Sequence, residues 1–258
     1  MKDHVPSTTP RSASTSASVR RAAAALAKAR HVCVLTGAGT SAESGIPTFR
    51  DAMTGLWSKF RPEDLATPDA FERDPQLVWG WYEWRRELVR GAEPNAGHHA
   101  LATLAGRIPR LTLVTQNVDG LHQRAGSRGV IEYHGNILQD RCSVEQVVAQ
   151  RSPGASQGLP HCATCGGLLR PNVVWFGEMI PRDALLRADA AAQECDLFLS
   201  VGTSSLVYPA AALAETALAR GIPLIEVNPN PTDLSSRADW VLAGPSGRLL
   251  PELLRALA

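Results

Sequence analysis

The sequence predicts an α/β fold in which a parallel sheet has helices on both faces and a small subdomain lies beside it. Short apolar runs of strand length alternate with segments of helical period along most of the chain. Each of these runs ends in a polar or glycine-rich turn, which is typical of the ligand-binding edge of a parallel sheet. Two further regions interrupt the alternation, and they account for the small subdomain.

The expected elements follow in a regular order. The first helix is expected over 18–30, with Ser18 as its N-cap and apolar residues at helical spacing. The expected strands are short and mostly apolar, which is typical of strands buried on both faces of a parallel sheet; they cover 31–36, 111–115, 197–201, 223–227 and 238–242. The other expected helices cover about 75–90, 97–106, 182–194 and 208–220.

The domain organisation follows from composition along the chain. Residues 1–18 are rich in Ser, Thr and Pro, and we expect a disordered tail there. The rest, 19–258, is expected to form one domain, whose large part combines 19–46, 76–135 and 173–258. The small subdomain combines 47–75, where four prolines predict a structured loop with short helices, and 136–172, a cysteine-bearing insertion.

Composition and charge are those of an ordinary globular protein, with 44% hydrophobic residues and a net charge of +1. They exclude a mostly disordered chain, and they exclude the large excess of positive charge with which proteins bind nucleic-acid backbones. No apolar run approaches the ~18 residues of a membrane span. The basic, Ser-rich start is too weakly apolar for a secretory signal, while an organelle presequence stays open beside a plain tail. The odd number of cysteines argues against a disulfide framework, and we expect a cytoplasmic monomer.

A glycine-rich turn follows the first expected strand. The stretch Gly37 to Ala42 fits the dinucleotide-binding pattern G-x-G-x-x-G/A in the required position after a strand, although a plain tight turn is the alternative. A nicotinamide dehydrogenase also needs a second strand with an acidic end about 20 residues later. Pro47 interrupts any long helix there, so the sequence indicates a dinucleotide without hydride transfer.

Further motifs identify a family. The stretches GAGTSAESGIPTFR (37–50), TQNVDGLH (115–122), YHG (133–135) and VVWFGE (173–178), followed by Gly202 to Ser204 and Val227–Asn228, occur in this order. Together they resemble the signature of the sirtuins, the NAD-dependent protein deacylases, over about 20–255. The resemblance implies a Rossmann-like parallel sheet with helices on both faces, plus a small zinc-module and helical subdomain.

The resemblance also implies the reaction and its residues. A sirtuin consumes NAD: nicotinamide leaves, and the acyl group of a modified lysine passes to ADP-ribose. His134 stands at the position of the general base and Asn117 at that of the second catalytic residue, and an imidazole pKa near ~6.5 suits proton transfer at neutral pH. The implied cofactor-binding residues are Gly37, Ala38, Gly39, Thr40, Ser41, Phe49, Arg50, Trp57, Gln116, Asn117, Val118, Asp119, Gly202, Thr203, Ser204, Asn228, Pro229, Asn230 and Ser246.

The acyl-lysine substrate is expected to bind as an extended peptide. By resemblance it pairs with the segment Val174, Trp175, Phe176, Gly177 and Glu178, which on its own reads as a buried strand. Ala66, Tyr82 and Arg85 match the desuccinylase class of the family. A cation and a hydroxyl suit an acidic acyl group such as succinyl or malonyl. The alternatives are a general deacetylase, a mono-ADP-ribosyltransferase and a silent NAD-binding module.

The metal module departs from the family pattern. Sirtuins usually carry C-x-x-C twice; Cys162 and Cys165 form an intact pair, but the first pair reads Cys142 to Glu145. We expect a structural zinc held by the three cysteines plus an oxygen or nitrogen ligand, with Glu145 or His161 as the candidates. A module folded without metal is the alternative.

Overall fold

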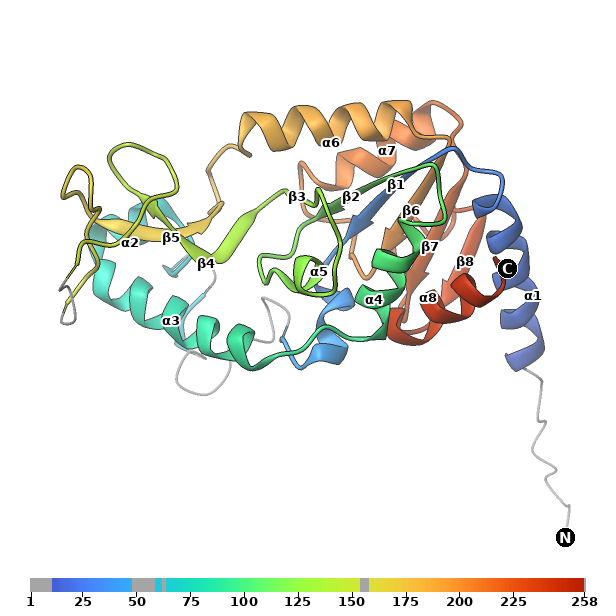
Figure 1. Ribbon diagram of the computed structural model, residues 1–258, viewed down its shortest axis with the longest axis horizontal. Coiled ribbons are helices and arrows are strands. Elements are labelled where there is room, and N and C mark those ends of the chain that lie inside the picture. Colours follow the sequence, from blue (N-terminus) through green and yellow to red (C-terminus); the bar gives the residue numbers. More distant parts are fainter. Residues whose placement is uncertain (1–10, 48–58, 62–63, 154–157, 258) are drawn as a thin grey trace, which may run out of the picture.

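A six-stranded parallel sheet lies at the centre of the molecule (Figure 1). The computed structural model describes residues 11–47, 59–61, 64–153 and 158–257. The strand order is β3-β2-β1-β6-β7-β8, and every pairing is parallel. The strands are β1 (His31–Thr36), β2 (Arg110–Thr115), β3 (Ile131–Glu132), β6 (Leu197–Val201), β7 (Leu224–Asn228) and β8 (Trp240–Ala243). The predicted parallel sheet is confirmed, and β3 is the strand that the sequence did not predict.

Helices cover both faces of this sheet because successive strand residues point to opposite sides. Val32 and Val34 of β1 pack in a cluster with α1 (Arg11–Leu26), α4 (Ala96–Leu104) and α8 (Ser246–Arg255). Cys33 and Leu35 pack on the opposite face with α6 (Arg182–Glu194) and α7 (Ala211–Ala219). Figure 1 shows α6 and α7 above the sheet and α4 and α8 below it.

A third core cluster lies beside the sheet. It joins α2 (Pro68–Arg73) and α3 (Pro75–Gly91) to an antiparallel pair, β4 (Gly135–Cys142) and β5 (Leu169–Val173). The Trp79 indole N–H of α3 donates to the Leu169 carbonyl of β5 at 2.9 Å. We expected α3 in the large part, but its buried aromatic side chains pack in this cluster, at the left of Figure 1. Helix α3 therefore shares its core with β4 and β5.

Two helices differ from expectation. The first helix begins at Arg11, seven residues before the expected start at Ser18. The physical reason is that 11–26 contains no Pro or Gly and many alanines, which favour helix. The second is α8, which the sequence did not predict because Pro251 lies inside it. Burial of its leucines against the sheet outweighs that break; they are Leu249, Leu250 and Leu253.

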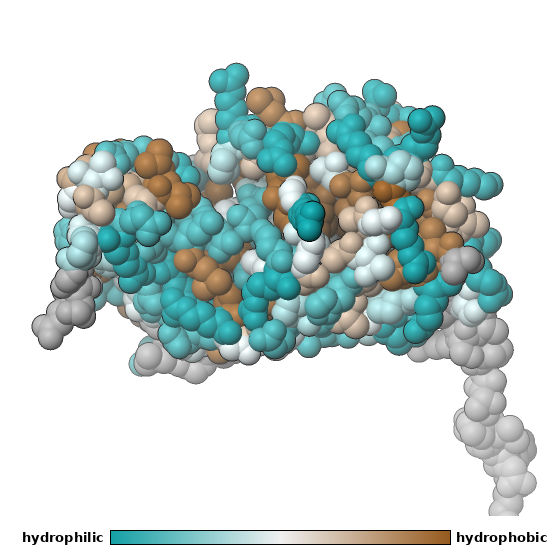
Figure 2. Space-filling view, viewed as in Figure 1, coloured by the Kyte–Doolittle hydropathy of each residue, from teal (hydrophilic) through white to brown (hydrophobic). Residues whose placement is uncertain are grey.

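Short turn elements follow β1 and β2 and hold the edge of the sheet. They are η1 (Ala38–Thr40), η2 (Ala42–Ser44) and α5 (Leu121–Arg124). Hydrophilic residues cover most of the face shown in Figure 2, with smaller apolar areas between them. Among the described residues, no helix combines the length and apolar character that crossing a membrane requires.

Candidate active site

The glycine-rich turn after β1 lies against the turn after β6. The N–H groups of Gly37 and Gly39 donate to the carbonyls of Val201 (3.0 Å) and Gly202 (2.8 Å). A Cβ at Gly39 would lie 2.8 Å from the Gly202 oxygen, and one at Gly202, whose φ is +58°, would lie 2.4 Å from the Thr40 nitrogen. Glycine is therefore required on both sides. The two turns form a close-packed rim.

A cavity of about 310 Å³ is lined by segments that are far apart in the sequence. They include the turn after β1, the loop after β2, helix α3 and the residues that follow β3, β5 and β6. The predicted site residues that line it are Ala38, Ser41, Ala66, Tyr82, Arg85, Gln116, Asn117, Val118, Asp119, His134, Val174, Trp175, Phe176, Gly177 and Glu178. The structure thus brings the predicted nicotinamide, acyl and peptide residues to one cavity.

Apolar parts of the lining were missed by sequence reasoning. They are Ile46, Pro47, Val89, Ile180, Val207, Tyr208 and Pro209. None of them carries a charged group, so their chemistry gives little signal in a sequence. Ile46 and Pro47 lie inside the motif 37–50, and that proximity was the one available indication.

The remaining predicted cofactor residues lie in the turns after β6 and β7 and at the start of α8. The Gln116 side-chain amide donates to Thr203 Oγ1 at 3.0 Å, and Asn228 Nδ2 donates to the Thr203 carbonyl at 2.8 Å. Ser204, Pro229 and Asn230 are exposed, whereas Ser246 is buried. Phe49, Arg50 and Trp57 lie outside the described residues.

Asn117 is the centre of a buried hydrogen-bond network beside the cavity. Its Nδ2 donates to the Gly37 carbonyl (3.1 Å) and to Ser41 Oγ (3.0 Å). Ser41 in turn donates to Asp119 Oδ2 at 2.7 Å, and the Leu121 N–H donates to Asp119 Oδ1 at 2.9 Å. Burial raises the pKa of the Asp119 carboxyl. The network fixes the Asn117 side chain, and its amide oxygen makes no hydrogen bond within the described residues.

A buried histidine pair supports this network, and sequence reasoning missed it. The Asn95 N–H donates to His98 Nδ1 (3.2 Å), so the other ring nitrogen, 3.4 Å from Ser41 Oγ, carries the proton. The His122 ring lies 4.8 Å away and contacts Thr36 Oγ1 through Nε2 at 2.9 Å. Burial lowers the pKa of His98 to about 4 and that of His122 to about 3. Both rings are therefore neutral at pH 7.

His134 presents one basic nitrogen. Its Nδ1 lies 3.0 Å from the Gln116 carbonyl oxygen, which only accepts, so Nδ1 carries the proton and Nε2 keeps a lone pair. Burial lowers the pKa of the half-buried ring, and the bond to the Gln116 carbonyl opposes this in part. The ring is thus an available base at neutral pH, with its orientation set by the backbone.

Helix α3 carries the polar groups at the predicted acyl end. Tyr82 is fully buried, and burial raises its pKa to about 12. Arg85 is half-buried, with its guanidinium carbon 4.9 Å from the centre of the Trp81 ring and 5.9 Å from that of Tyr82. Burial lowers the Arg85 pKa. Ala66 is 3% exposed and lines the same cavity. A cation and a phenol thus lie on one helix face beside a small side chain.

The segment after β5 is not a strand, because β5 ends at Val173. The alternative interpretation of this segment as a buried strand therefore does not hold beyond Val173. The N–H groups of Val174 and Phe176 donate to the carbonyls of His134 and Ala66, both at 3.0 Å, and that of Trp175 donates to Glu178 Oε2 at 2.8 Å. These bonds explain why the segment turns at Gly177, whose φ is +86°.

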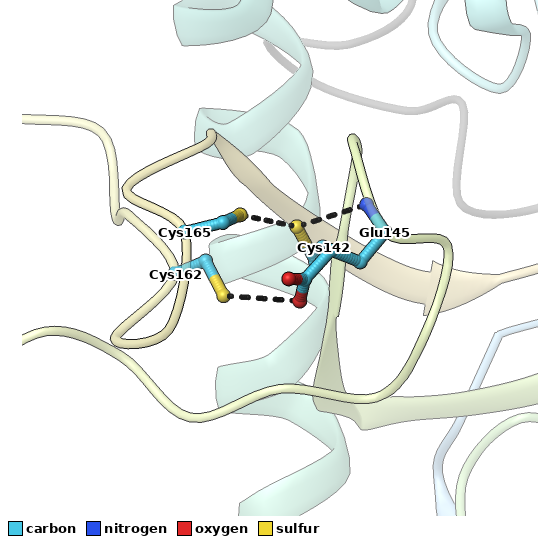
Figure 3. A group of neighbouring side chains, drawn as sticks. All are labelled: Cys142, Glu145, Cys162 and Cys165. Atoms are coloured by element: carbon cyan, nitrogen blue, oxygen red, sulfur yellow. Dashed lines mark hydrogen bonds between the residues drawn. The ribbon is translucent and has the colours of Figure 1, made fainter.

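Cys142, Glu145, Cys162 and Cys165 form a cluster at the other end of β4 (Figure 3). Their ligand atoms all lie within 4.8 Å of one another. In tetrahedral zinc, sulfur ligands lie about 3.8 Å apart, so this arrangement fits the metal. The Glu145 N–H also donates to Cys142 Sγ at 3.4 Å. His161 is outside the cluster: its Nδ1 lies 2.8 Å from the Gly166 carbonyl oxygen.

A family model described as Sir2 family matches residues 37–209. The chain belongs to the Sir2 family. The matched stretch contains the glycine rim after β1, Asn117, His134 and all four members of the cysteine and glutamate cluster. The resemblance to the sirtuins is therefore confirmed.

Other Sir2 proteins agree over nearly the whole chain. NAD-dependent protein deacylase 1 of Pseudomonas aeruginosa is 52% identical over 238 residues, which cover 89% of this chain and 95% of that protein. A crystal structure of a Sir2 homologue–NAD complex has a TM-score of 0.85 and 43% identity, covering 99% of this chain and 96% of the other. A Sir2–p53 peptide–NAD⁺ complex has a TM-score of 0.79 and 32% identity, covering 90% and 95%.

Proposed function

We propose that this Sir2 protein is an NAD-dependent protein-lysine deacylase that transfers the acyl group of a modified lysine to ADP-ribose. One observation carries the proposal: His134, with its Nδ1 held by the Gln116 carbonyl, lies in the same cavity as Asn117 and the Tyr82–Arg85 pair. A general base, a carboxamide-binding amide and an acyl-binding pair of side chains thus lie in one cavity. The relatives named NAD-dependent protein deacylase and the peptide and NAD complexes of Sir2 proteins support it.

The residues present fit the cofactor. The turn from Gly37 to Ala42 fits the dinucleotide-binding pattern after a strand, and the Asn117 amide oxygen is available for a carboxamide N–H. When bound, NAD supplies a ribose carbon as the acceptor and nicotinamide as the leaving group. Ser41 and Asp119 hold Asn117 in place, and Phe176 covers part of the cavity. His134 Nε2 accepts the proton of a ribose hydroxyl, which general-base catalysis requires.

We further propose a preference for acidic acyl groups, succinyl and malonyl, with acetyl as a secondary substrate. Arg85 and Tyr82 support this, because a guanidinium and a phenol at the cavity wall complement a terminal carboxylate. Burial strengthens such a pair, since the surrounding dielectric is lower than that of water. The test compares kcat/KM for acetyl-, malonyl-, succinyl- and glutaryl-lysine on one peptide. A higher value for acetyl-lysine than for every acidic acyl group would contradict the preference.

We also propose that the metal site is a structural zinc with three thiolates and the Glu145 carboxylate. Glu145 supports this because its Oε2 lies 4.0 Å from Cys162 Sγ and its backbone N–H donates to Cys142. Cys142 and Cys162 belong to the third core cluster, and none of the four residues lines the cavity that holds His134, so the role of the metal is to hold the β4–β5 module. The expected cytoplasmic location and monomeric state stay predictions.

A further inference from the structure

Trp175 and Tyr82 are joined by a buried hydrogen bond between segments 93 residues apart. The Trp175 indole N–H donates to Tyr82 Oη at 2.8 Å, and the ring centroids lie 6.3 Å apart. Trp175 is 3% exposed and Tyr82 is fully buried. Both line the cavity. The bond therefore lies at the acyl end of the proposed active site and links its wall to helix α3.

The indole has several independent contacts that hold it in place. The Arg170 guanidinium carbon lies 3.7 Å from the centre of the Trp175 ring. Arg170 is bidentate to Glu178, with distances of 2.5 and 2.7 Å, and Glu178 accepts the Trp175 backbone N–H. The Phe71 ring packs at 5.4 Å. The indole N–H thus points at Tyr82 from a fixed direction.

The direction of this bond decides what the phenol can do. An indole N–H is a donor only, so Tyr82 Oη must accept from it. The hydroxyl proton of Tyr82 is then left for another acceptor, and no acceptor for it occurs within the described residues. Because burial raises the Tyr82 pKa to about 12, the phenol keeps this proton throughout the neutral range.

We propose that Trp175 is a positioning residue for acyl specificity: by occupying a lone pair of Tyr82 Oη, it turns the phenol proton toward the cavity. There the proton meets the terminal carboxylate of an acidic acyl group, beside Arg85. An acetyl group carries no such acceptor and gains nothing from this orientation. The inference rests on the proposed acidic-acyl preference and adds the residue that sets the phenol's donor direction.

The test is Trp175→Phe, which keeps an aromatic ring but removes the N–H. We expect the ratio of kcat/KM for succinyl-lysine to that for acetyl-lysine to fall by about two- to tenfold, the size of one hydrogen bond. In a Tyr82→Phe background the same change should leave the ratio where it is, because the phenol it orients is gone. An equal fall in both backgrounds would overturn the proposal.

Trp79→Phe is the matched control. Trp79 is 4% exposed, belongs to the same core cluster, donates its indole N–H to a backbone carbonyl and lies 4.9 Å from the Arg86 guanidinium carbon. Trp79→Phe should lower the free energy of unfolding by a similar amount, while the ratio of kcat/KM for succinyl-lysine to that for acetyl-lysine stays unchanged. A ratio that falls equally in both variants, or in neither, would contradict the orienting role.

Two further results are decisive. If Trp175→Phe does not fold, benzothienylalanine at 175 replaces the N–H by sulfur at nearly constant shape, and the same ratio is measured. If the native protein shows no desuccinylation that depends on Arg85, the acidic-acyl preference itself fails and the inference falls with it. Arg85-dependent desuccinylation with an unchanged ratio in Trp175→Phe overturns the inference alone.

Discussion

Replacing Arg85 by Met isolates the charge at the acyl end of the cavity. Arg85 lies one turn after Tyr82 on α3, and its guanidinium carbon lies 4.9 Å from the centre of the Trp81 ring. Methionine keeps the helix propensity and most of the apolar stem, but it removes the guanidinium. The change therefore tests recognition of a carboxylate with little disturbance of the core that holds it.

The magnitude follows from the burial of the site. A hydrogen bond to a charged group contributes about 1.5–3 kcal/mol, which corresponds to roughly a tenfold to hundredfold change in kcat/KM. Because Arg85 is half-buried, solvent screens part of the interaction, and the lower half of this range is expected. The value of kcat/KM should fall by this factor for succinyl- and malonyl-lysine, and it should fall less for acetyl-lysine.

The assay is kcat/KM for succinyl- and acetyl-lysine on one peptide, with Arg90→Met as control. Arg90 lies on the same helix, is half exposed and pairs with Glu87 at 2.8 Å. It is not part of the cavity lining, so its loss should leave the ratio unchanged. Equal loss of both activities in Arg85→Met would reject the acidic-acyl pocket and favour a general deacetylase.

Other predictions address the base, the buried histidine and the metal. His134→Ala should lower deacylation by about 10²–10⁴-fold while NAD binding, followed by calorimetry, persists; near-native turnover would reject the base. Since burial lowers the His134 pKa, activity should hold as pH falls to the ordinary value of ~6.5 and drop only below it. Because His122 stays neutral in the fold, with a pKa of about 3, it should lower the free energy of unfolding by about 1–2 kcal/mol between pH 7 and pH 5. His98 acts in the same direction, so His122→Asn should reduce this pH dependence of stability without removing it. Metal analysis should find close to one zinc per chain, and Cys142→Ser should lower both zinc content and thermal stability; a zinc-free, equally stable protein would contradict the site.

The sheet could be predicted from sequence because its central strands β1, β6 and β7 are buried on both faces and end in recognisable turns. The run from His31 to Thr36 matches β1 residue for residue. The core that contains α3 and the helix α8 were not predicted, and the cause is different. The core of α3 is set by contacts with β5 across 90 residues, and Pro251 conceals α8 because the local break is outweighed by tertiary burial.

The site was predictable where function is carried by distinctive residues in short motifs. Asn117, His134 and Arg85 meet at one cavity as the motifs indicate. The buried pair of His98 and His122 was not predicted, because single histidines carry no spacing signal and their contact forms only in the fold. The direction of the Trp175–Tyr82 bond is likewise a product of tertiary packing, which no local pattern specifies.

The central claim is that the acyl group passes from lysine to ADP-ribose, and mass spectrometry of the products tests it most directly. The purified protein is incubated with NAD and a succinyl-lysine peptide, and all products are quantified. We expect nicotinamide, free lysine peptide and 2′-O-succinyl-ADP-ribose in equal amounts. ADP-ribose attached to protein, with the acyl group still on lysine, would contradict the account and identify a mono-ADP-ribosyltransferase in the same cavity.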